Sequence, residues 1–285
     1  MNHRIVFRVA VVLVCVAGLL MGQAQKQGQA APQGQAAPPA AAAPVGSPVA
    51  KQPQVKSQPE AQAVMAILQA PDPDARLKAC NELVNKFADS EFKALALFFG
   101  AVSYQQKGDS DRMIVYAERT LEADKEHYQA MLMLAGAIAQ RTREHDLDRE
   151  EKLKAAEGYA NKALEILKTA PRPNPTIADD QWEMAKKEFA AQAHEAFALA
   201  AMARTQNDKA IEEFKTALAM SSEPDPSTQV RLAAVYSRAA KYDEAIAVLD
   251  KVLAAPELNP QVKKIAQAEK DRTVQLKQKG AAPAK

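Results

Sequence analysis

The stretch "YDEAIAVLDKVL", Tyr242 to Leu253, repeats the pattern of "NDKAIEEFKTAL", Asn207 to Leu218, about 35 residues earlier in the chain. Both segments carry Asp, Ala and Ile at the same places, and both end on Leu. Apolar residues in the later segment recur three and four positions apart, which is typical of an amphipathic helix with one buried face. The two segments therefore predict equivalent helices in successive copies of a structural repeat.

The same helical spacing continues from Glu60 to about Lys277, and no run of alternating β-branched residues indicates a strand. Prolines gather at positions 71/73, 171/173/175, 224/226 and 256/260, where they can end or begin helices without interrupting them. The sequence therefore predicts an all-α fold.

Pairs of helices are expected to start near Ala94, Tyr128, Ala191 and Pro226, so the period within each half is about 34 or 35 residues. Each start leads to a large and a small residue side by side and then to a bulky one, with lapses at Gly100 and Ala201. Small residues let two antiparallel helices approach, and the bulky residue fills the space against the next pair. These sets are Gly100-Ala101 with Tyr104, Leu134-Ala135 with Ile138, Phe197-Ala198 with Ala201, and Leu232-Ala233 with Tyr236.

This pattern resembles the tetratricopeptide repeat family, whose motif runs W-x2-L-G-x2-Y, then A-x3-F, then P. Clear matches to the second part are Ala210 with Phe214 and Ala245 with Leu249, whereas the Trp of the motif is absent from every repeat. The resemblance implies a right-handed α-solenoid of antiparallel helix pairs. The repeats are expected near residues 94–127, 128–170, 191–225 and 226–259.

The N-terminal residues 1–24 have the layout of a secretory signal peptide: a basic start with Arg4 and Arg8, an apolar run of about 13 residues, and a small-residue end at Gly22 and Ala24. We expect cleavage after Ala24 and export to the periplasm or cell envelope. Because the apolar run is shorter than the roughly 20 residues that span a bilayer, an uncleaved membrane anchor is the second interpretation. Membrane contact is expected only in that case.

Three further segments follow this leader. Residues 25–59 are rich in Pro, Ala and Gln and almost free of large apolar residues, so they predict a disordered linker. The helical repeat domain is expected over residues 60–278, with helices before the first repeat and after the last one acting as caps. Residues 279–285 are expected to be a disordered tail.

The balance of charge argues against a nucleic-acid partner. With Arg4 and Arg8 removed, 35 basic residues face 35 acidic ones, and such a chain has no overall attraction for phosphate backbones. Cys80 is then the only cysteine, so no internal disulfide can form, and we interpret it as a small core residue.

Motifs that carry chemistry are absent or incomplete. No phosphate-binding glycine loop is present, and His194-Glu195 begins the zinc motif H-E-x-x-H but has Ala198 where the second His is needed. The insertion at 141–152 contains "REHDLDREE", which a charged solvated loop explains better than a cation site because it lacks the glycine turn of a calcium loop. We therefore expect no catalytic residue, no cofactor and no metal.

In tetratricopeptide proteins the first helices of successive repeats line a groove in which partner peptides lie, so the resemblance implies a protein or peptide partner. Part of the set can equally be core, and a carboxylate clamp of Lys and Asn residues is not visible in it. Carried over by register, the groove positions are Phe98, Val102, Gln105, Leu132, Gly136, Gln140, Glu195, Leu199, Met202, Val230, Ala234 and Arg238.

The sequence thus favours a non-catalytic adaptor of the cell envelope that binds a protein or peptide. Two rival hypotheses remain open. The first is a structural or spacer component of an envelope assembly. The second is an envelope enzyme that uses the 141–152 insertion.

Overall fold

A computed structural model describes residues 48–281, and these divide into two compact units. The first unit lies within Met1–Glu126 and also contains Lys168–Ala185; the second consists of His127–Leu167 and Lys186–Lys285. The expected signal peptide, most of the expected linker and the last four residues of the tail lie outside the described part.

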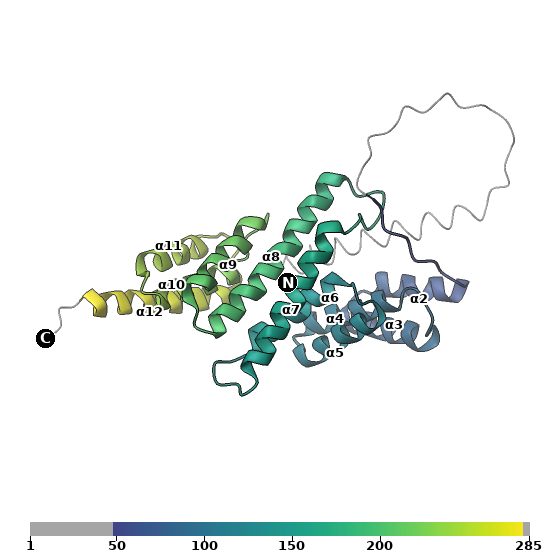
Figure 1. The fold of residues 1–285 in the computed structure, drawn as a ribbon, viewed down its shortest axis with the longest axis horizontal. Coiled ribbons are helices and arrows are strands. Elements are labelled where there is room, and N and C mark those ends of the chain that lie inside the picture. The colour runs from purple at the N-terminus through teal and green to yellow at the C-terminus, as the bar shows by residue number, and fades with distance from the viewer. Residues whose placement is uncertain (1–47, 282–285) are drawn as a thin grey trace, which may run out of the picture. The chain divides into compact units, whose positions relative to one another are not determined.

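Among residues 48–281 the structure contains eleven helices and no strand beyond one isolated bridge. The all-α prediction, with antiparallel helix pairs, is therefore confirmed (Figure 1). The helices are α2 (Gln58–Leu68), α3 (Pro73–Lys86), α4 (Lys93–Lys107), α5 (Ser110–Ala123), α6 (Tyr128–Arg141), α7 (Arg149–Thr169), α8 (Asp179–Ala203), α9 (Asn207–Met220), α10 (Pro226–Arg238), α11 (Tyr242–Leu253) and α12 (Pro260–Ala281).

Helix starts lie close to the expected repeat boundaries, with one long exception. Helices α4, α6 and α10 begin at Lys93, Tyr128 and Pro226, but α8 begins at Asp179, well before the expected Ala191. The additional turns of α8 carry Trp182, which is buried. None of the helices in the described residues combines the length and the apolar character that a membrane crossing requires.

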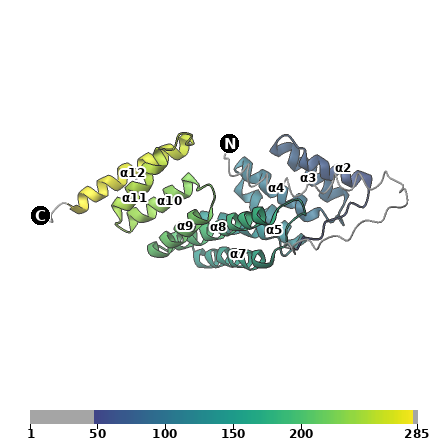
Figure 2. The ribbon, with the colours of Figure 1, turned by 90° about the horizontal axis from the view of Figure 1, so that it is seen from above.

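The first unit stacks α2, α3, α4 and α5 in chain order, and each contacts the next (Figure 2). Its core consists of apolar residues on the inward faces, among them Val64, Ile67, Leu83 and Phe99. At one point two helices approach so closely that only glycine fits, because a Cβ on Gly100 would lie 2.4 Å from the ring of Tyr116. The expected large–small pair at 100–101 therefore lapses for a physical reason.

The second unit is built on two apolar clusters. One cluster contains residues of all the helices from α6 through α10, among them the buried Ala139, Leu153, Phe214 and Leu232. The other joins α10, α11 and α12 around Leu249. The expected C-terminal cap is present as α12, which packs on both α10 and α11 and keeps a polar outer surface.

Three of the pairs turn from their first to their second helix in the same way. The residue after the first helix, or one beyond it, has a positive φ: Gly108 at 74°, Thr205 at 58° and Ala240 at 58°. The N–H of the next residue then donates to the carbonyl five residues back. This bond gives a hydrogen-bond donor to one of the carbonyls left without a partner at the C-terminal end of the first helix. These bonds are Asp109 to Tyr104 at 3.0 Å, Gln206 to Ala201 at 2.9 Å and Lys241 to Tyr236 at 2.9 Å.

The expected linker is ordered along its last part, which we call the strap (residues 48–56). Its backbone forms a parallel bridge with Arg172, since the Arg172 N–H donates to the Pro48 carbonyl at 2.8 Å and the Ala50 N–H donates to the Arg172 carbonyl at 2.8 Å. The strap then leads into α2, where the buried carboxylate of Glu60 accepts from the Lys56 N–H and from the Ser90 hydroxyl. Among the described residues, tertiary contacts are therefore already present at Pro48, ahead of the expected start at Glu60.

Candidate protein-binding face

The expected groove residues divide between the two units and between core and surface. Phe98, Val102 and Gln105 belong to the first unit, and the other nine belong to the second. Five of the twelve are buried and therefore belong to the core, which is the alternative that the sequence left open for part of the set. The buried residues are Phe98, Val102, Leu132, Leu199 and Val230.

Seven of the expected residues remain accessible. Each helix buries one face of its surface. The expected groove positions lie beside that face, so some of them are buried and others remain accessible. The accessible residues are Gln105, Gly136, Gln140, Glu195, Met202, Ala234 and Arg238.

In the second unit the accessible positions of α8 and α10 form what we call the first-helix face: Glu195, Met202, Arg231, Ala234 and Arg238. On α10 the last three follow each other at the three- and four-residue spacing that puts side chains on one side of a helix. All five are half-buried or exposed. The face therefore presents an aliphatic thioether, a small residue and three charged groups.

Glu195 links the two helices of this face. Its Oε1 accepts from Nη1 of Arg231 at 2.9 Å and from the hydroxyl of Thr228 at 2.9 Å. The side chains of Glu195 and Arg231 are 19% and 28% exposed, so the pair is partly shielded from water. The Glu195 carboxylate is thus neutralised within the chain and does not stand as a free anion for a ligand.

Arg238 differs from Arg231 in having no hydrogen bond or ion pair with any described residue. It is exposed at the C-terminal end of α10. A guanidinium in this position can bind a carboxylate through two parallel N–H donors. Among the described residues, the face therefore offers one free cation beside a neutralised pair.

Arg231 was missed at the level of sequence. The signal was present, because Arg231 follows Glu195 by 36 residues, close to one repeat period, and opposite charges one period apart are placed to meet. Unless the repeat period is applied, one Arg and one Glu in a chain with 72 charged residues cannot be predicted to form an ion pair.

His194, considered for zinc, makes a local contact. Its Nδ1 lies 2.7 Å from Oε2 of Glu213 on the partner helix α9, and its ring meets Phe197 edge-on. Within residues 48–281 no group of three or more His, Cys, Asp and Glu side chains is placed to hold a metal ion. His194 therefore joins the two helices of one pair.

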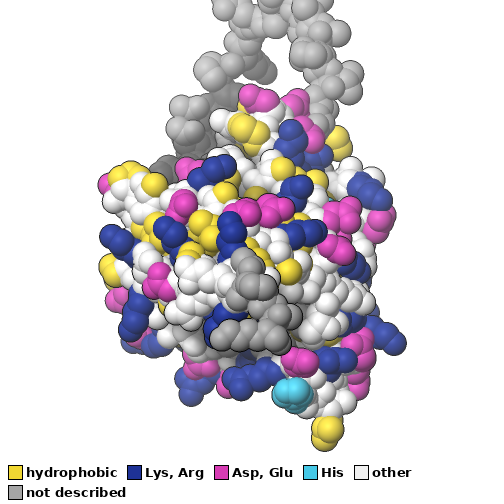
Figure 3. Space-filling view, turned by 90° about the vertical axis from the view of Figure 1, so that its left-hand side faces the viewer, with side chains coloured by type: hydrophobic (Ala, Val, Ile, Leu, Met, Phe, Trp, Pro, Cys, Tyr) yellow, Lys and Arg dark blue, Asp and Glu magenta, His cyan; other side chains and the backbone are white. Residues whose placement is uncertain are grey.

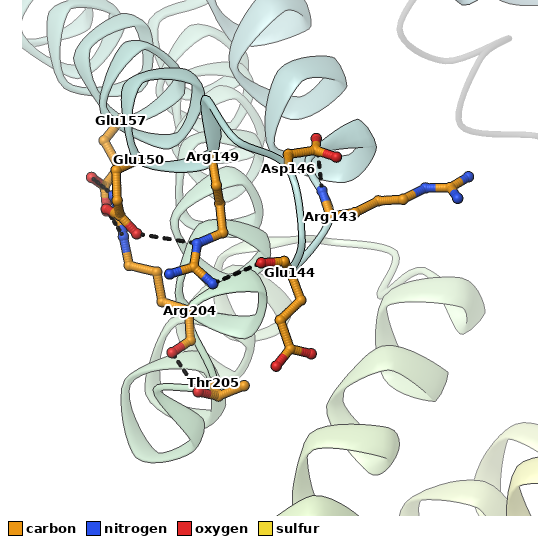
Figure 4. Close-up of polar contacts among 8 residues, drawn as sticks. All are labelled: Arg143, Glu144, Asp146, Arg149, Glu150, Glu157, Arg204 and Thr205. Carbon is orange, nitrogen blue, oxygen red and sulfur yellow. Dashed lines mark hydrogen bonds and ion pairs between the residues drawn. The ribbon is translucent and has the colours of Figure 1, made fainter.

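The charged insertion forms a loop, residues 142–148, that is tied to itself (Figure 4). The Arg143 N–H donates to the Asp146 carboxylate at 3.2 Å, and Arg149 Nη1 donates to the Glu144 carbonyl at 3.0 Å. The Arg143 amide holds the pKa of Asp146 below its ordinary value. Lys152 adds ion pairs with Asp146 and with Asp148.

Beside this loop Arg204 binds two acids of α7. Its Nη1 and Nη2 donate to the two oxygens of Glu157 at 2.7 and 3.1 Å, and its Nε donates to Glu150 at 2.9 Å (Figure 4). Hydrogen bonding to Arg204 lowers the pKa of Glu150, and bonding to Glu157 raises the pKa of Arg204. Several charges near the insertion are thus paired with one another in positions that stabilise the loop and the start of α7.

Charges of both signs are interspersed with apolar side chains over the surface seen in Figure 3. No strongly basic or strongly acidic field covers this face, as expected of a chain with balanced charge.

Comparison with known proteins gives a family for part of the chain. Residues 201–268, which run from the end of α8 into α12, match the tetratricopeptide repeat model. No curated protein matches the chain closely enough to count as a relative.

Three solved structures are similar to the chain. A thermophilic TPR protein of Thermus thermophilus is 21% identical, with 74% of this chain and 96% of that one covered and a TM-score of 0.45. A MamA double mutant (RS-1 ArsTM) is 12% identical over 80% and 99%, with a TM-score of 0.45. The assembly chaperone of RpL4 (Acl4, residues 1–338) is 13% identical over 78% and 97%, with a TM-score of 0.41. Residues 201–268 therefore match the tetratricopeptide repeat family, and the helix pairs and turns described above show a repeated α-helical architecture in the described residues.

Proposed function

We propose that the chain is a non-catalytic adaptor whose first-helix face binds an extended segment of a partner protein. The observation that supports this most is the combination of a free Arg238 with accessible Met202 and Ala234 on the helices that carry the tetratricopeptide match. Repeats of this kind commonly bind protein partners. The partner segment would bring a carboxylate to Arg238 and an apolar side chain to Met202.

We also propose that the protein acts in the periplasm or cell envelope, on the strength of the signal-peptide pattern in residues 1–24. The N-terminus of the protein purified from its native source tests this proposal. A chain that begins at Gln25 supports export, and a chain that still carries Met1 in the cytoplasmic fraction contradicts it.

The binding proposal is tested by exchanging Arg238 for Glu and comparing the proteins that co-purify with wild-type and variant chains from envelope extract. Loss of one dominant partner supports the adaptor function. The matched control is Lys215→Glu, which makes the same charge change on the exposed side of α9 and should leave that partner in place. Equal capture by all three chains would favour the spacer role.

A further inference from the structure

The strap lies on a second surface of the first unit, which we call the track: Asp89, Glu91, Arg172 and Pro173. Beyond the backbone bridge at Arg172, Nε2 of Gln52 donates to the Pro173 carbonyl at 2.8 Å. Further along, the Gln54 N–H donates to the Glu91 carboxylate at 3.1 Å, and Nζ of Lys56 lies 2.8 Å from the Asp89 carboxylate. The strap is therefore held at four points along its length, in the manner of a bound peptide.

Loop 170–175, which carries Arg172 and Pro173 of the track, also has hydrogen bonds that do not involve the strap. The buried Trp182 donates its indole N–H to the Ala170 carbonyl at 3.1 Å, and Nη1 of Arg172 donates to the Ile177 carbonyl at 3.0 Å. Asn174 is buried and accepts from the N–H of Thr176. Trp182, the only tryptophan of the chain, thus helps to hold the proline-rich loop 170–175 in place through its bond to Ala170.

The strap itself contributes little buried surface. None of residues 48–56 is buried, and Val49, its first apolar side chain, is 39% exposed. Its contacts are backbone and polar bonds at the surface, and a segment held in this way opens at a small fraction of the free energy of global unfolding. The track can therefore lose the strap while its own shape persists.

The contacts also define what the track recognises. Arg172 offers one N–H and one carbonyl to an extended backbone, which is the recognition mode of strand addition. Asp89 and Glu91 offer carboxylates, and hydrogen bonding between Asp89 and Lys56 raises the pKa of Lys56 and lowers the pKa of Asp89. The matching ligand is an extended segment with a lysine a few residues after its backbone contacts.

We propose that the track is a second peptide-binding site, separate from the first-helix face, that takes an extended lysine-bearing protein segment, and that the strap occupies it as a competitor within the same chain. A competitor of this kind reduces the apparent affinity for an incoming segment by the fraction of time that the track is open. Substitutions that weaken the contacts of the strap should therefore increase the affinity of the track for an added peptide.

The test uses the full chain and a fluorescent peptide of residues 48–57, with binding followed by anisotropy. The Lys56→Glu chain places a like charge against Asp89 and Glu91 and should release its own strap, so it should bind the wild-type peptide about tenfold more tightly than the wild-type chain does. Equal binding by the two chains, or binding by neither, would overturn the proposal. Unchanged Trp182 fluorescence shows that the variant has kept the loop 170–175.

A charge exchange provides the matched control. Asp89 is 85% exposed, so Asp89→Lys should leave the fold intact. The chain with Asp89→Lys and Lys56→Glu re-forms the pair with its signs reversed, and its strap should again exclude the wild-type peptide. Strong binding of that peptide by the doubly changed chain would contradict recognition through Asp89. Dimers of the wild-type chain that disappear on addition of the peptide would identify a second copy as the source of the segment.

Discussion

Two residues in the described part adopt a left-handed backbone without being glycine, and both occupy the same place in their repeats. Thr205 and Ala240 each have a φ of 58° in the turn after the first helix, where Gly108 has 74° in an earlier pair. The left-handed conformation costs a residue with a Cβ about 1–2 kcal/mol. The turn geometry is therefore imposed by the helix pairing around it and not by local preference.

Ala240→Gly should stabilise the protein by about 0.5–1 kcal/mol, because the strain removed exceeds the entropy that glycine adds to the unfolded chain. Thermal unfolding measures the change. Gly108→Ala is the mirror-image control and should lower stability by about 1 kcal/mol. A lower melting temperature for Ala240→Gly would show that the turn is not strained.

Gly100→Ala should destabilise the first unit by about 1–3 kcal/mol, as overpacking does, although alanine favours helix. The new Cβ would lie 2.4 Å from the Tyr116 ring, which cannot shift freely because its hydroxyl donates to Asn81 at 2.6 Å and its ring packs on Tyr104. Chemical denaturation measures the loss.

Gly158→Ala is the control for that change, since nothing lies within 4 Å of its new Cβ in the middle of α7. It should stabilise by up to about 1 kcal/mol through helix propensity alone. Similar effects at both glycines would contradict close packing at Gly100.

At the scale of elements, the loop 142–148 and the start of α7 depend on ionised carboxylates. The pKa values of Asp146 and Glu150 are lowered from their ordinary 3.8 and 4.5 by the Arg143 amide and by Arg204, respectively. A lowered pKa means that the folded state favours the charged form. This contribution is present above the ordinary values and is lost as the pH falls through the lowered ones.

We therefore expect the hydrogen-exchange protection of residues 143–152 to fall as the pH drops from about 6 to about 3, with protection in α9 retained. Asp146→Ala should reproduce part of the loss at neutral pH, because the Arg143 N–H then lacks its acceptor. Equal protection at both pH values would show that the loop is held by other means.

Sequence periodicity predicted most of these elements because each repeat uses the same small and bulky positions. It placed the starts of α4, α6 and α10 within a residue or two from the repeat period, and at α10 the proline cluster at 224/226 agrees with that period. The repeat period alone does not place the start of α8, because the helical turns before Ala191 serve the first unit through Trp182 and follow no repeat motif. The strap was missed for a related reason: its composition indicates disorder, and only the distant loop at Arg172 orders it.

The binding face was partly predictable for the same reason. The repeat register identifies the side of a helix on which a residue lies but not how deeply its side chain is buried. Leu199 was therefore assigned to the groove together with Met202, although Leu199 is 4% exposed and belongs to the core. The residues that remain available to a partner could be separated from the core only when the packing of α8, α9 and α10 was known.

The molecule as a whole is an all-α protein whose residues 201–268 match the tetratricopeptide repeat family, and we propose a binding role for it. The proposed partner site lies on first helices of the second unit, and the buried thiol of the first unit takes no part in it. Burial raises the pKa of Cys80 to about 12, so the thiol stays protonated and unreactive in the folded chain.

This property gives a test of the folded state. In a Cys15→Ser chain, Cys80 should react with a thiol reagent at neutral pH only as fast as the protein unfolds. Adding denaturant should bring the reaction to the rate of a free cysteine. Rapid labelling of the native chain would contradict the burial of this residue.

The central claim is tested most directly by a photo-crosslinking residue at Ala234, in the full chain, with Lys215 on α9 as the comparison position. Both sites are accessible to solvent, and only Ala234 lies on the first-helix face. We predict one dominant crosslinked protein from Ala234 that is absent from Lys215 and is lost in the Arg238→Glu chain. The same crosslinks from both positions, or none from Ala234, would contradict a partner site on this face.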